Sequence, residues 1–213
     1  MMKKPGLINP LELRQFQFQG IIFCGGHATG PLVLQDTQSF THTMYKNTCN
    51  TPYTITVPKS VKILGNNAFI GVKGKINIDL SNLTSIGKEA FAESDLTGTI
   101  KISKNLKFTG PEAFRKTKIT AVIIEEGVTE LGYKDYVPFG IFRDCPNLKS
   151  ITLPSTLTEL GGCVFNYCPA LAEVIIPKGT KITYRNNWEF SCCSSLPLAA
   201  KAKIKATGYT DGF

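Results

Sequence analysis

The stretch FRDCPNLKSITLP, from Phe142 to Pro154, recurs as FNYCPALAEVIIP from Phe165 to Pro177. The two copies align without a gap. Each has Phe, then Cys-Pro, then Leu two residues further on, then an alternating apolar segment that ends in Pro. They begin 23 residues apart, an interval typical of solenoid proteins, in which each copy forms one coil of a stack. The alternative is that the two cysteines form a chemical site, and every copy should then keep them.

The Phe of this repeat recurs through most of the chain. It occupies six positions: Phe69, Phe91, Phe114, Phe142, Phe165 and Phe190. The intervals are 22, 23, 28, 23 and 25 residues, and the longest contains an insertion after Gly132. A glycine stands four residues before the Phe in four copies, at Gly65, Gly87, Gly110 and Gly161, and Asn186 takes this place in the last copy. Asn replaces Gly best where φ is positive, so we expect left-handed backbone at this position.

Each copy also contains a short apolar alternation bounded by Pro or Gly, which predicts a short strand. These segments are Ile55–Val57, Ile76–Ile78, Ile100–Ile102, Val122–Ile124, Ile151–Leu153 and Val174–Ile176. A second apolar pair follows: Val61 and Ile63, Leu83 and Ile86, Leu106 and Phe108, Val128 and Leu131, Leu157 and Leu160. One such unit cannot enclose its own apolar face, but stacked units can. We therefore predict a solenoid with coils about 4.8 Å apart, in which each Phe, Ile and Leu lies on its counterpart.

The cysteine position answers the question that the two copies raise. Three residues after each Phe stand Val72, Ser94, Thr117, Cys145, Cys168 and Cys193. A metal or nucleophile site would not accept Val, Ser and Thr, so the position selects a small, buriable side chain. None of the seven cysteines forms a C-x-x-C pair of the zinc type. Cys145, Cys168 and Cys193 should lie on successive coils, and we expect buried thiols rather than disulfides.

Three segments carry a family resemblance: LKSITLPSTLTELGGCVFNYC (Leu148–Cys168), VPKSVKILGNNAF (Val57–Phe69) and LTSIGKEAF (Leu83–Phe91). They resemble the BspA-type leucine-rich repeats, a family of bacterial and protist surface proteins. The resemblance covers about Cys49 to Leu196. It implies a right-handed leucine-rich repeat coil of α/β type, with a short-stranded parallel sheet on one face and turns and helical segments behind it. It also implies a role in binding or adhesion, not in catalysis, and a secreted or cell-surface location.

The resemblance and the repeats together divide the chain into three parts. Residues 1–48 do not repeat and form either an N-terminal cap or a small β module. Residues 49–196 form the solenoid of about six coils. Residues 197–213 resemble a C-terminal closing piece, with a short Ala/Lys helix that shields the last coil. Lys3 and Lys4 are not followed by the apolar stretch of a secretory signal, so the sequence leaves the location open.

The composition and the motifs limit the classes of function that the chain can have. The 213 residues are 42% hydrophobic and carry a net charge of +8, with lysines scattered and not clustered. No segment is apolar enough to span a membrane, and no nucleic-acid motif is present. The Gly25–Gly30 stretch, GGHATG, lacks the Lys-Ser/Thr of a P-loop and indicates a turn. The two histidines, His27 and His42, have no orienting partner, so we predict neither an enzyme nor a bound metal or cofactor.

Two sets of residues are candidates for ligand binding. Alternation along the strands directs one set to the outer face of the sheet: Thr56, Asn77, Lys101, Ile123, Thr152 and Ile175. The second set lies in the inserted loops: Tyr133, Tyr136, Phe139, Tyr184 and Trp188. The loop aromatics either recognise a ligand or fold back on the coil. We expect a non-catalytic module that binds a protein or cell-surface ligand. The alternative is a basic solenoid that binds an anionic polymer, either a glycan or, with less support, nucleic acid.

Overall fold

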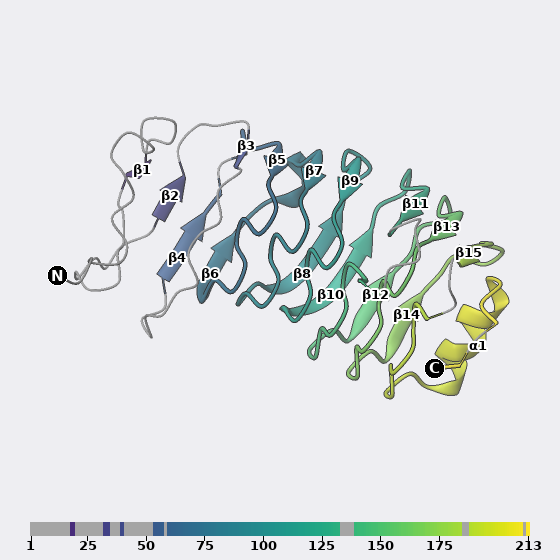
Figure 1. Ribbon diagram of the computed structural model, residues 1–213. Helices are drawn as coiled ribbons and strands as arrows, with labels where there is room; N and C mark the ends of the chain where they lie inside the picture. Colours follow the sequence, from purple (N-terminus) through teal and green to yellow (C-terminus); the bar gives the residue numbers. More distant parts are fainter. Residues whose placement is uncertain are drawn as a thin grey trace.

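The computed structural model describes residues 53–57, 59–132, 139–184, 188–210 and 212–213, together with the backbone of three short strands nearer the N-terminus. Figure 1 shows an elongated stack of coils that ends in one α-helix, α1 (Leu198–Ala206). Each coil passes through three sides. We call them the broad ladder, the narrow ladder and the turn ladder.

The broad ladder carries the longest strands, and its neighbouring strands are parallel between coils. One sheet contains β2 (Leu32–Leu34), β4 (Tyr53–Thr56) and β6 (Gly74–Asn77). The other contains β8 (Thr97–Ile102), β10 (Lys118–Ile124), β12 (Ser150–Thr152) and β14 (Glu173–Ile175). These bounds confirm the predicted strand positions, since each predicted alternation overlaps one of the strands from β4 to β14.

The narrow ladder consists of strands of two residues each, also parallel. They are β3 (Ser39–Phe40), β5 (Ile63–Leu64), β7 (Ser85–Ile86) and β9 (Phe108–Thr109), followed in a separate sheet by β11 (Glu130–Leu131), β13 (Glu159–Leu160) and β15 (Thr183–Tyr184). A 3₁₀ helix, η2 (Leu80–Asn82), precedes β7. The family resemblance implied turns and helical segments behind the sheet. The structure has these turns and the η2 helix, and in addition the narrow ladder of short parallel strands.

The turn ladder contains the repeated Phe. The Phe backbone N–H of one coil donates to a carbonyl of the next, for example from Phe91 to Ala113 at 2.7 Å and from Phe142 to Val164 at 2.9 Å. Residues two before and two after the Phe adopt positive φ in most coils, as at Glu112 (φ 56°) and Lys116 (φ 56°). Their N–H groups then also point toward the next coil, as from Lys116 to the Arg143 carbonyl at 3.1 Å. Hydrogen bonds therefore connect the coils on all three sides.

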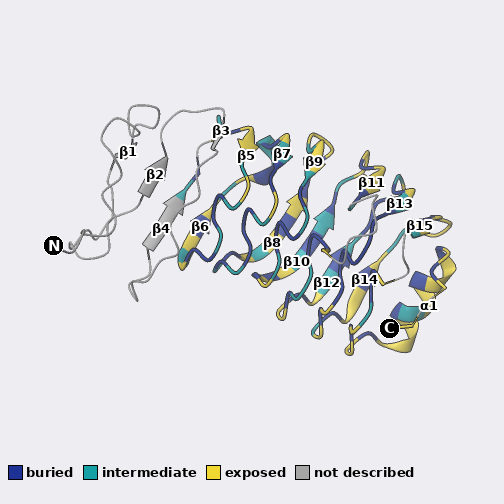
Figure 2. Cartoon of the chain, in the orientation of Figure 1, coloured by how far each residue is buried: buried dark blue, intermediate teal, exposed yellow. Residues whose placement is uncertain are grey.

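The six Phe side chains form one continuous column, as the sequence predicts. Neighbouring rings are stacked, with centroids 5.1–5.7 Å apart and planes 5–18° from parallel. All six are fully buried. Figure 2 shows that buried residues follow the inner side of each coil along the stack, so the core is a rod and not a globule. The core of one coil is completed by its neighbours.

The cysteine column confirms that this position selects small, buried side chains. Ser94 and Thr117 donate to the carbonyl of the Phe in their own coil, at 2.7 and 2.8 Å. The thiols of Cys145, Cys168 and Cys193 instead donate to the Phe carbonyl of the preceding coil, at 3.1, 3.2 and 3.2 Å. The three thiols form no disulfide. Burial raises the pKa of the Cys193 thiol to about 11.

The glycine before each Phe is required for a reason that differs from the predicted one. Gly65, Gly87, Gly110 and Gly161 do not have positive φ. A Cβ on Gly110 would instead lie 2.3 Å from the Lys88 backbone nitrogen, and a Cβ on Gly87 would lie 2.5 Å from that of Asn66. The position therefore needs glycine because two coils approach closely, and the prediction of left-handed backbone was wrong. Asn186, the counterpart in the last coil, lies outside the described residues.

Two of the predicted second apolar pairs also need correction. In β5 the buried residue is Leu64, whereas Ile63 is 42% exposed. In β9, Phe108 is 46% exposed. Ser85 pairs in register with both residues, so Ile63, Ser85 and Phe108 all lie on the outer side of the narrow ladder.

The C-terminal segment closes the stack. Ala200 and Ile204 of α1 are buried, and the Ile182 N–H donates to the Thr207 carbonyl at 2.9 Å. The Tyr209 ring meets the Phe190 ring edge-on at 5.6 Å, with planes 89° apart, so no further parallel ring can stack there. The resemblance to a closing piece therefore agrees with the packing.

Near the N-terminus, β1 (Phe18–Gln19) is antiparallel to β2, while β2 and β3 already pair in parallel with the next coil. Parallel pairing thus begins before residue 49. The division into residues 1–48, 49–196 and 197–213 stays a prediction.

Candidate ligand-binding surface

The broad ladder positions the six predicted sheet-face residues. Thr56 pairs in register with Asn77 in one sheet. Lys101, Ile123, Thr152 and Ile175 are successive register partners in the other. Lys101, Ile123 and Thr152 each lie between two buried residues, and Thr56, Asn77 and Ile175 each have a buried residue on one side, so these side chains point away from the core. The structure thus aligns these side chains in two rows along the stack.

The two rows are separated by a break between β6 and β8, which belong to different sheets. After β6 the chain turns at Asp79, whose side chain accepts hydrogen bonds from the Ser81 hydroxyl at 2.6 Å and the Ser81 N–H at 3.0 Å. These hydrogen bonds hold the pKa of the Asp79 carboxyl below its usual value. The turn leads into η2, so Asn77 and Lys101 are not register partners.

The chemistry of the outer face changes along the stack. Lys75, Asn77 and Lys101 are exposed at the N-terminal half. Toward the C-terminal half, Ile123 is half-buried between Lys101 and Thr152, and Ile175 is 47% exposed. An exposed Ile next to Thr on a regular strand surface is suited to contact a partner that is partly apolar.

The predicted loop aromatics differ in their surroundings. Tyr133 and Tyr136 lie outside the described residues. Phe139 and Trp188 are 41% and 51% exposed. Tyr184 folds back on the coil: its ring meets the Tyr209 ring edge-on at 5.0 Å, and its hydroxyl shares a hydrogen bond with Thr207. Burial raises the pKa of Tyr184 to about 12.

Phe139 and Trp188 belong to the turn ladder and not to the broad ladder. The Trp188 carbonyl accepts a hydrogen bond from the Asn166 side chain at 3.2 Å. The structure therefore does not bring these loop residues and the sheet-face row together on one side of the coil.

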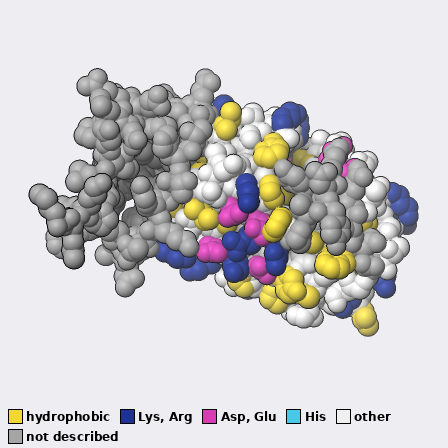
Figure 3. Space-filling view, viewed as in Figure 1, with side chains coloured by type: hydrophobic (Ala, Val, Ile, Leu, Met, Phe, Trp, Pro, Cys, Tyr) yellow, Lys and Arg dark blue, Asp and Glu magenta, His cyan; other side chains and the backbone are white. Residues whose placement is uncertain are grey.

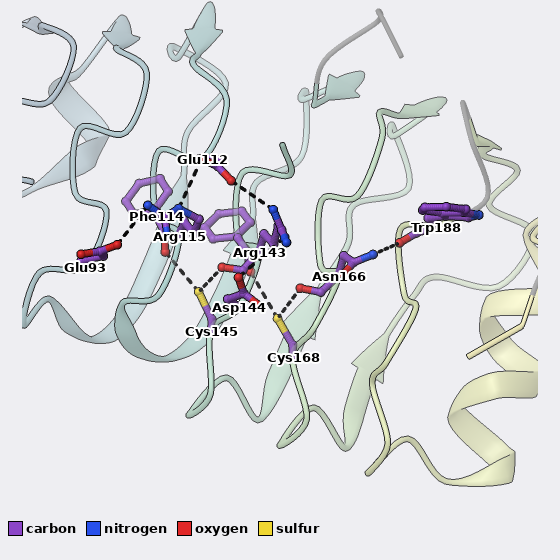
Figure 4. Close-up of polar contacts among 11 residues, drawn as sticks. Glu93, Glu112, Phe114, Arg115, Arg143, Asp144, Cys145, Asn166, Cys168 and Trp188 are labelled. Carbon is purple, nitrogen blue, oxygen red and sulfur yellow. Dashed lines mark hydrogen bonds and ion pairs between the residues drawn. The ribbon is translucent and has the colours of Figure 1, made fainter. Parts of the chain in front are cut away.

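A network of charged residues crosses the turn ladder, and sequence reasoning missed it. In Figure 3, acidic and basic side chains lie interleaved over the middle of the stack. The Arg115 guanidinium lies 3.1 Å from Glu93 and 3.3 Å from Glu112, and the Arg143 guanidinium lies 3.4 Å from Glu112 (Figure 4). Each coil supplies one or two members, so the ion pairs join three successive coils. The available signal was an alternation of charge at residues beside the repeated Phe.

Tyr167 is a second residue that sequence reasoning did not single out. It lies two residues after Phe165 with φ 56° and is 48% exposed. The Arg143 guanidinium carbon lies 5.7 Å from the centre of its ring, within cation–π range. The ring is therefore half-exposed beside Arg143 at the surface of the turn ladder.

Among the described residues, no group of three or more His, Cys, Asp or Glu side chains is placed to hold a metal ion. Within the same residues, no helix has the length and apolar character needed to cross a membrane.

Comparison with known proteins places the chain in a family. A search of curated proteins finds no match. A solved leucine-rich repeat protein of T. pallidum is 21% identical, covers 92% of this chain and 94% of its own, and has a TM-score of 0.59, which shows that the two share a fold. A leucine-rich repeat protein from Bacteroides ovatus is 17% identical over 91% of this chain and 81% of its own, with a TM-score of 0.23. The pneumococcal vaccine antigen PcpA is 17% identical over 78% and 69%, with a TM-score of 0.26. The family model described as the BspA type leucine-rich repeat region (6 copies) matches residues 34–137 and 134–203. The chain belongs to the BspA-type leucine-rich repeat family.

Proposed function

We propose that the chain is a non-catalytic interaction module that binds a protein or cell-surface ligand through the outer face of the broad ladder. The observation that carries the proposal is the row of register partners Lys101, Ile123, Thr152 and Ile175. Ladder hydrogen bonds fix the backbones of Ile123 and Thr152 on both sides and those of Lys101 and Ile175 on one side, so little conformational entropy is lost at this surface on binding.

Ile175 supplies the anchor in this proposal. Burying an exposed aliphatic side chain in an interface contributes to affinity, while its polar neighbours provide register and specificity. Thr152 lies beside it, and Lys101 at the other end of the row adds a positive charge. Phe139 and Trp188 remain proposed contacts at the side of the coil. Tyr184 has a packing role in this proposal because its ring and hydroxyl are engaged by the C-terminal segment.

The test compares two isoleucines of similar exposure on different sides of the coil. Ile175 is 47% exposed on the broad ladder, and Ile63 is 42% exposed on the narrow ladder. The wild-type chain and the Ile175→Asp and Ile63→Asp variants are immobilised and used to capture proteins from a cell-surface extract. We expect Ile175→Asp to lose the captured protein and Ile63→Asp to retain it, with similar melting temperatures. Equal retention by both variants would contradict the proposal.

The alternative is that the exposed lysines of the N-terminal half, Lys75 and Lys101, bind an anionic polymer such as a glycan. Salt separates the two functions, because binding driven by phosphate or sulfate groups weakens steeply as ionic strength rises. Capture that survives physiological salt and depends on Ile175 supports the protein ligand.

A further inference from the structure

The outer side of α1 has an unusual distribution of apolar and charged residues. A helix on the surface of a protein normally presents charged residues to solvent, opposite its buried stripe. In α1 the buried residues are Ala200 and Ile204, and the side opposite to them includes Leu198, Ala199, Ala202 and Ala206, all exposed. Leu198 is 85% exposed, the highest value among the exposed large apolar side chains of the described residues. The apolar strip therefore faces away from the protein.

Lysines border this strip on both sides. With about 3.6 residues per turn, Lys201 lies on one flank of α1 and Lys203 on the other, and Lys205, seven residues after Leu198, lies at the edge of the strip beside Leu198. The ammonium groups of Lys201 and Lys205 are held over the Phe213 ring, 5.2 and 5.9 Å from its centre. Lys203 is exposed. Positive charge therefore lies along both edges of the apolar strip.

The charge around α1 is not neutralised by described acidic residues. No ion pair to a carboxylate of the described part of the chain involves Lys201, Lys203 or Lys205, and the first turn of α1 has no acidic residue. Lys181 adds a further positive charge beside the helix, since its ammonium group donates to the Ala206 carbonyl at 3.1 Å. On the face drawn in Figure 3, the end of the stack that carries α1 shows Lys or Arg and no Asp or Glu beside them.

We propose that α1 is a peripheral docking element for an anionic lipid surface, with Leu198 and the alanine strip inserted among the headgroups and the flanking lysines at the phosphates. An apolar strip bordered by lysines is the arrangement of a helix that lies in a membrane interface. Lysine stems extend along apolar surface while their ammonium groups stay in water, so the two flanks can reach headgroups on both sides. The apolar strip would not add to the affinity for a soluble polyanion, because such a polymer has no apolar region in which the Leu198 side chain could be buried.

The element is short, so the interaction is weak and reversible. Each lysine near an anionic leaflet strengthens binding roughly fivefold, and the effect is lost beyond a Debye length. A single Leu and small alanines add a limited apolar contribution. α1 packs beside β14 of the broad ladder, but its exposed strip is not part of the sheet-face row, and the inference does not depend on the ligand of the proposed function.

Vesicle co-sedimentation tests the proposal with the full chain. The probes are vesicles of pure phosphatidylcholine and vesicles of equal parts phosphatidylcholine and phosphatidylserine, at low and at physiological salt. We expect binding to the anionic vesicles only, weakened by salt. The double variant Lys203→Glu/Lys205→Glu should reduce the affinity by at least roughly 25-fold, from two lysines at about fivefold each. Leu198→Ser should reduce it severalfold without changing the net charge.

The matched control is Lys104→Glu/Lys107→Glu, which makes the same charge change at two exposed lysines in the middle of the stack. It should change the affinity for anionic vesicles far less than the α1 double variant. Circular dichroism melting establishes that each variant is folded. A variant of α1 that unfolds is replaced by Lys203→Gln, which keeps helix propensity and should still weaken vesicle binding severalfold.

Dextran sulfate, a soluble polyanion, decides between the membrane and a general polyanion site. The proposal would be overturned if the chain bound dextran sulfate as tightly as anionic vesicles and the Leu198→Ser variant had the wild-type affinity for both. That result would assign the lysines to polymer binding. Absence of binding to anionic vesicles at low salt would also overturn it.

Discussion

Gly110 shows that a residue in this fold can be selected by the neighbouring coil and not by its own backbone. Its φ lies outside the left-handed region, but a Cβ there would meet the Lys88 nitrogen at 2.3 Å and the Gly87 carbonyl carbon at 2.5 Å. Gly179 is the opposite case, because its φ is +88° and a Cβ would meet nothing within 4 Å. Gly110 is therefore required by the close approach of two coils, whereas Gly179 is required by its own backbone conformation.

We predict that Gly110→Ala lowers the free energy of unfolding by about 3 kcal/mol, because the coils must move apart to admit the methyl group. Gly179→Ala should lower it by about 1 kcal/mol, the cost of a left-handed alanine. Urea denaturation of both variants measures the two values. Equal losses, or a larger loss at Gly179, would show that close approach of the coils does not select glycine at this position.

At the scale of elements, Asp95 connects three segments of neighbouring coils. Its carboxylate lies 2.8 Å from the Lys118 ammonium group of β10 and accepts a hydrogen bond from the Gly74 N–H of β6 at 3.1 Å. Burial alone would raise the pKa of Asp95. The hydrogen bonds from Lys118 and Gly74 and the charges of Lys118 and Lys73 outweigh it, so the pKa lies below its ordinary value. The carboxylate is therefore stabilised in the folded state.

A pH titration of stability tests this contact. A carboxyl whose pKa is lowered by folding contributes stability that is present above its unfolded pKa of about 3.9 and is lost as pH falls through the folded pKa. We predict that Asp95→Asn is less stable than the wild type at neutral pH, and that the difference shrinks as the pH is lowered past about 4. Thermal melts between neutral and acidic pH measure it. A difference that stays constant over this range would contradict the assignment.

The elements also show how far the sequence could predict the structure. The Phe and Cys columns and the register within each row of sheet-face residues were predictable, because like residues recur at one interval and can only stack on their counterparts. The break between β6 and β8, which separates the two rows, was not predictable. The narrow ladder was not, since two-residue strands such as β5 carry no alternation to read. Whether Ile63 or Leu64 faces inward depends on the preceding turn. The role of the repeated glycine depends on the backbone of the next coil, which no local pattern reveals.

The placement of the candidate residues was predictable to a similar extent, and their binding role stays a prediction. Strand alternation directed Ile123 and Ile175 outward because their neighbours Val122, Val174 and Ile176 recur as core positions. The packing of Tyr184 was left open by the sequence, because its partner Tyr209 lies in the closing segment and follows no repeat. The charged network of Glu93, Glu112, Arg115 and Arg143 joins residues that are far apart in sequence, and no single coil contains it.

At the scale of the whole molecule, the account depends on one continuous column of aromatic rings that runs from Phe69 to Phe190. Nuclear Overhauser measurements on a deuterated chain with protonated Phe rings test it most directly, with each ring assigned through a Phe→Leu variant. With centroids 5.1–5.7 Å apart, we predict ring-to-ring contacts in series: Phe69 to Phe91, Phe91 to Phe114, Phe114 to Phe142, Phe142 to Phe165 and Phe165 to Phe190. Absence of the contacts in the middle of this series, or strong contacts that skip a ring, such as Phe91 to Phe165, would contradict the stacked solenoid.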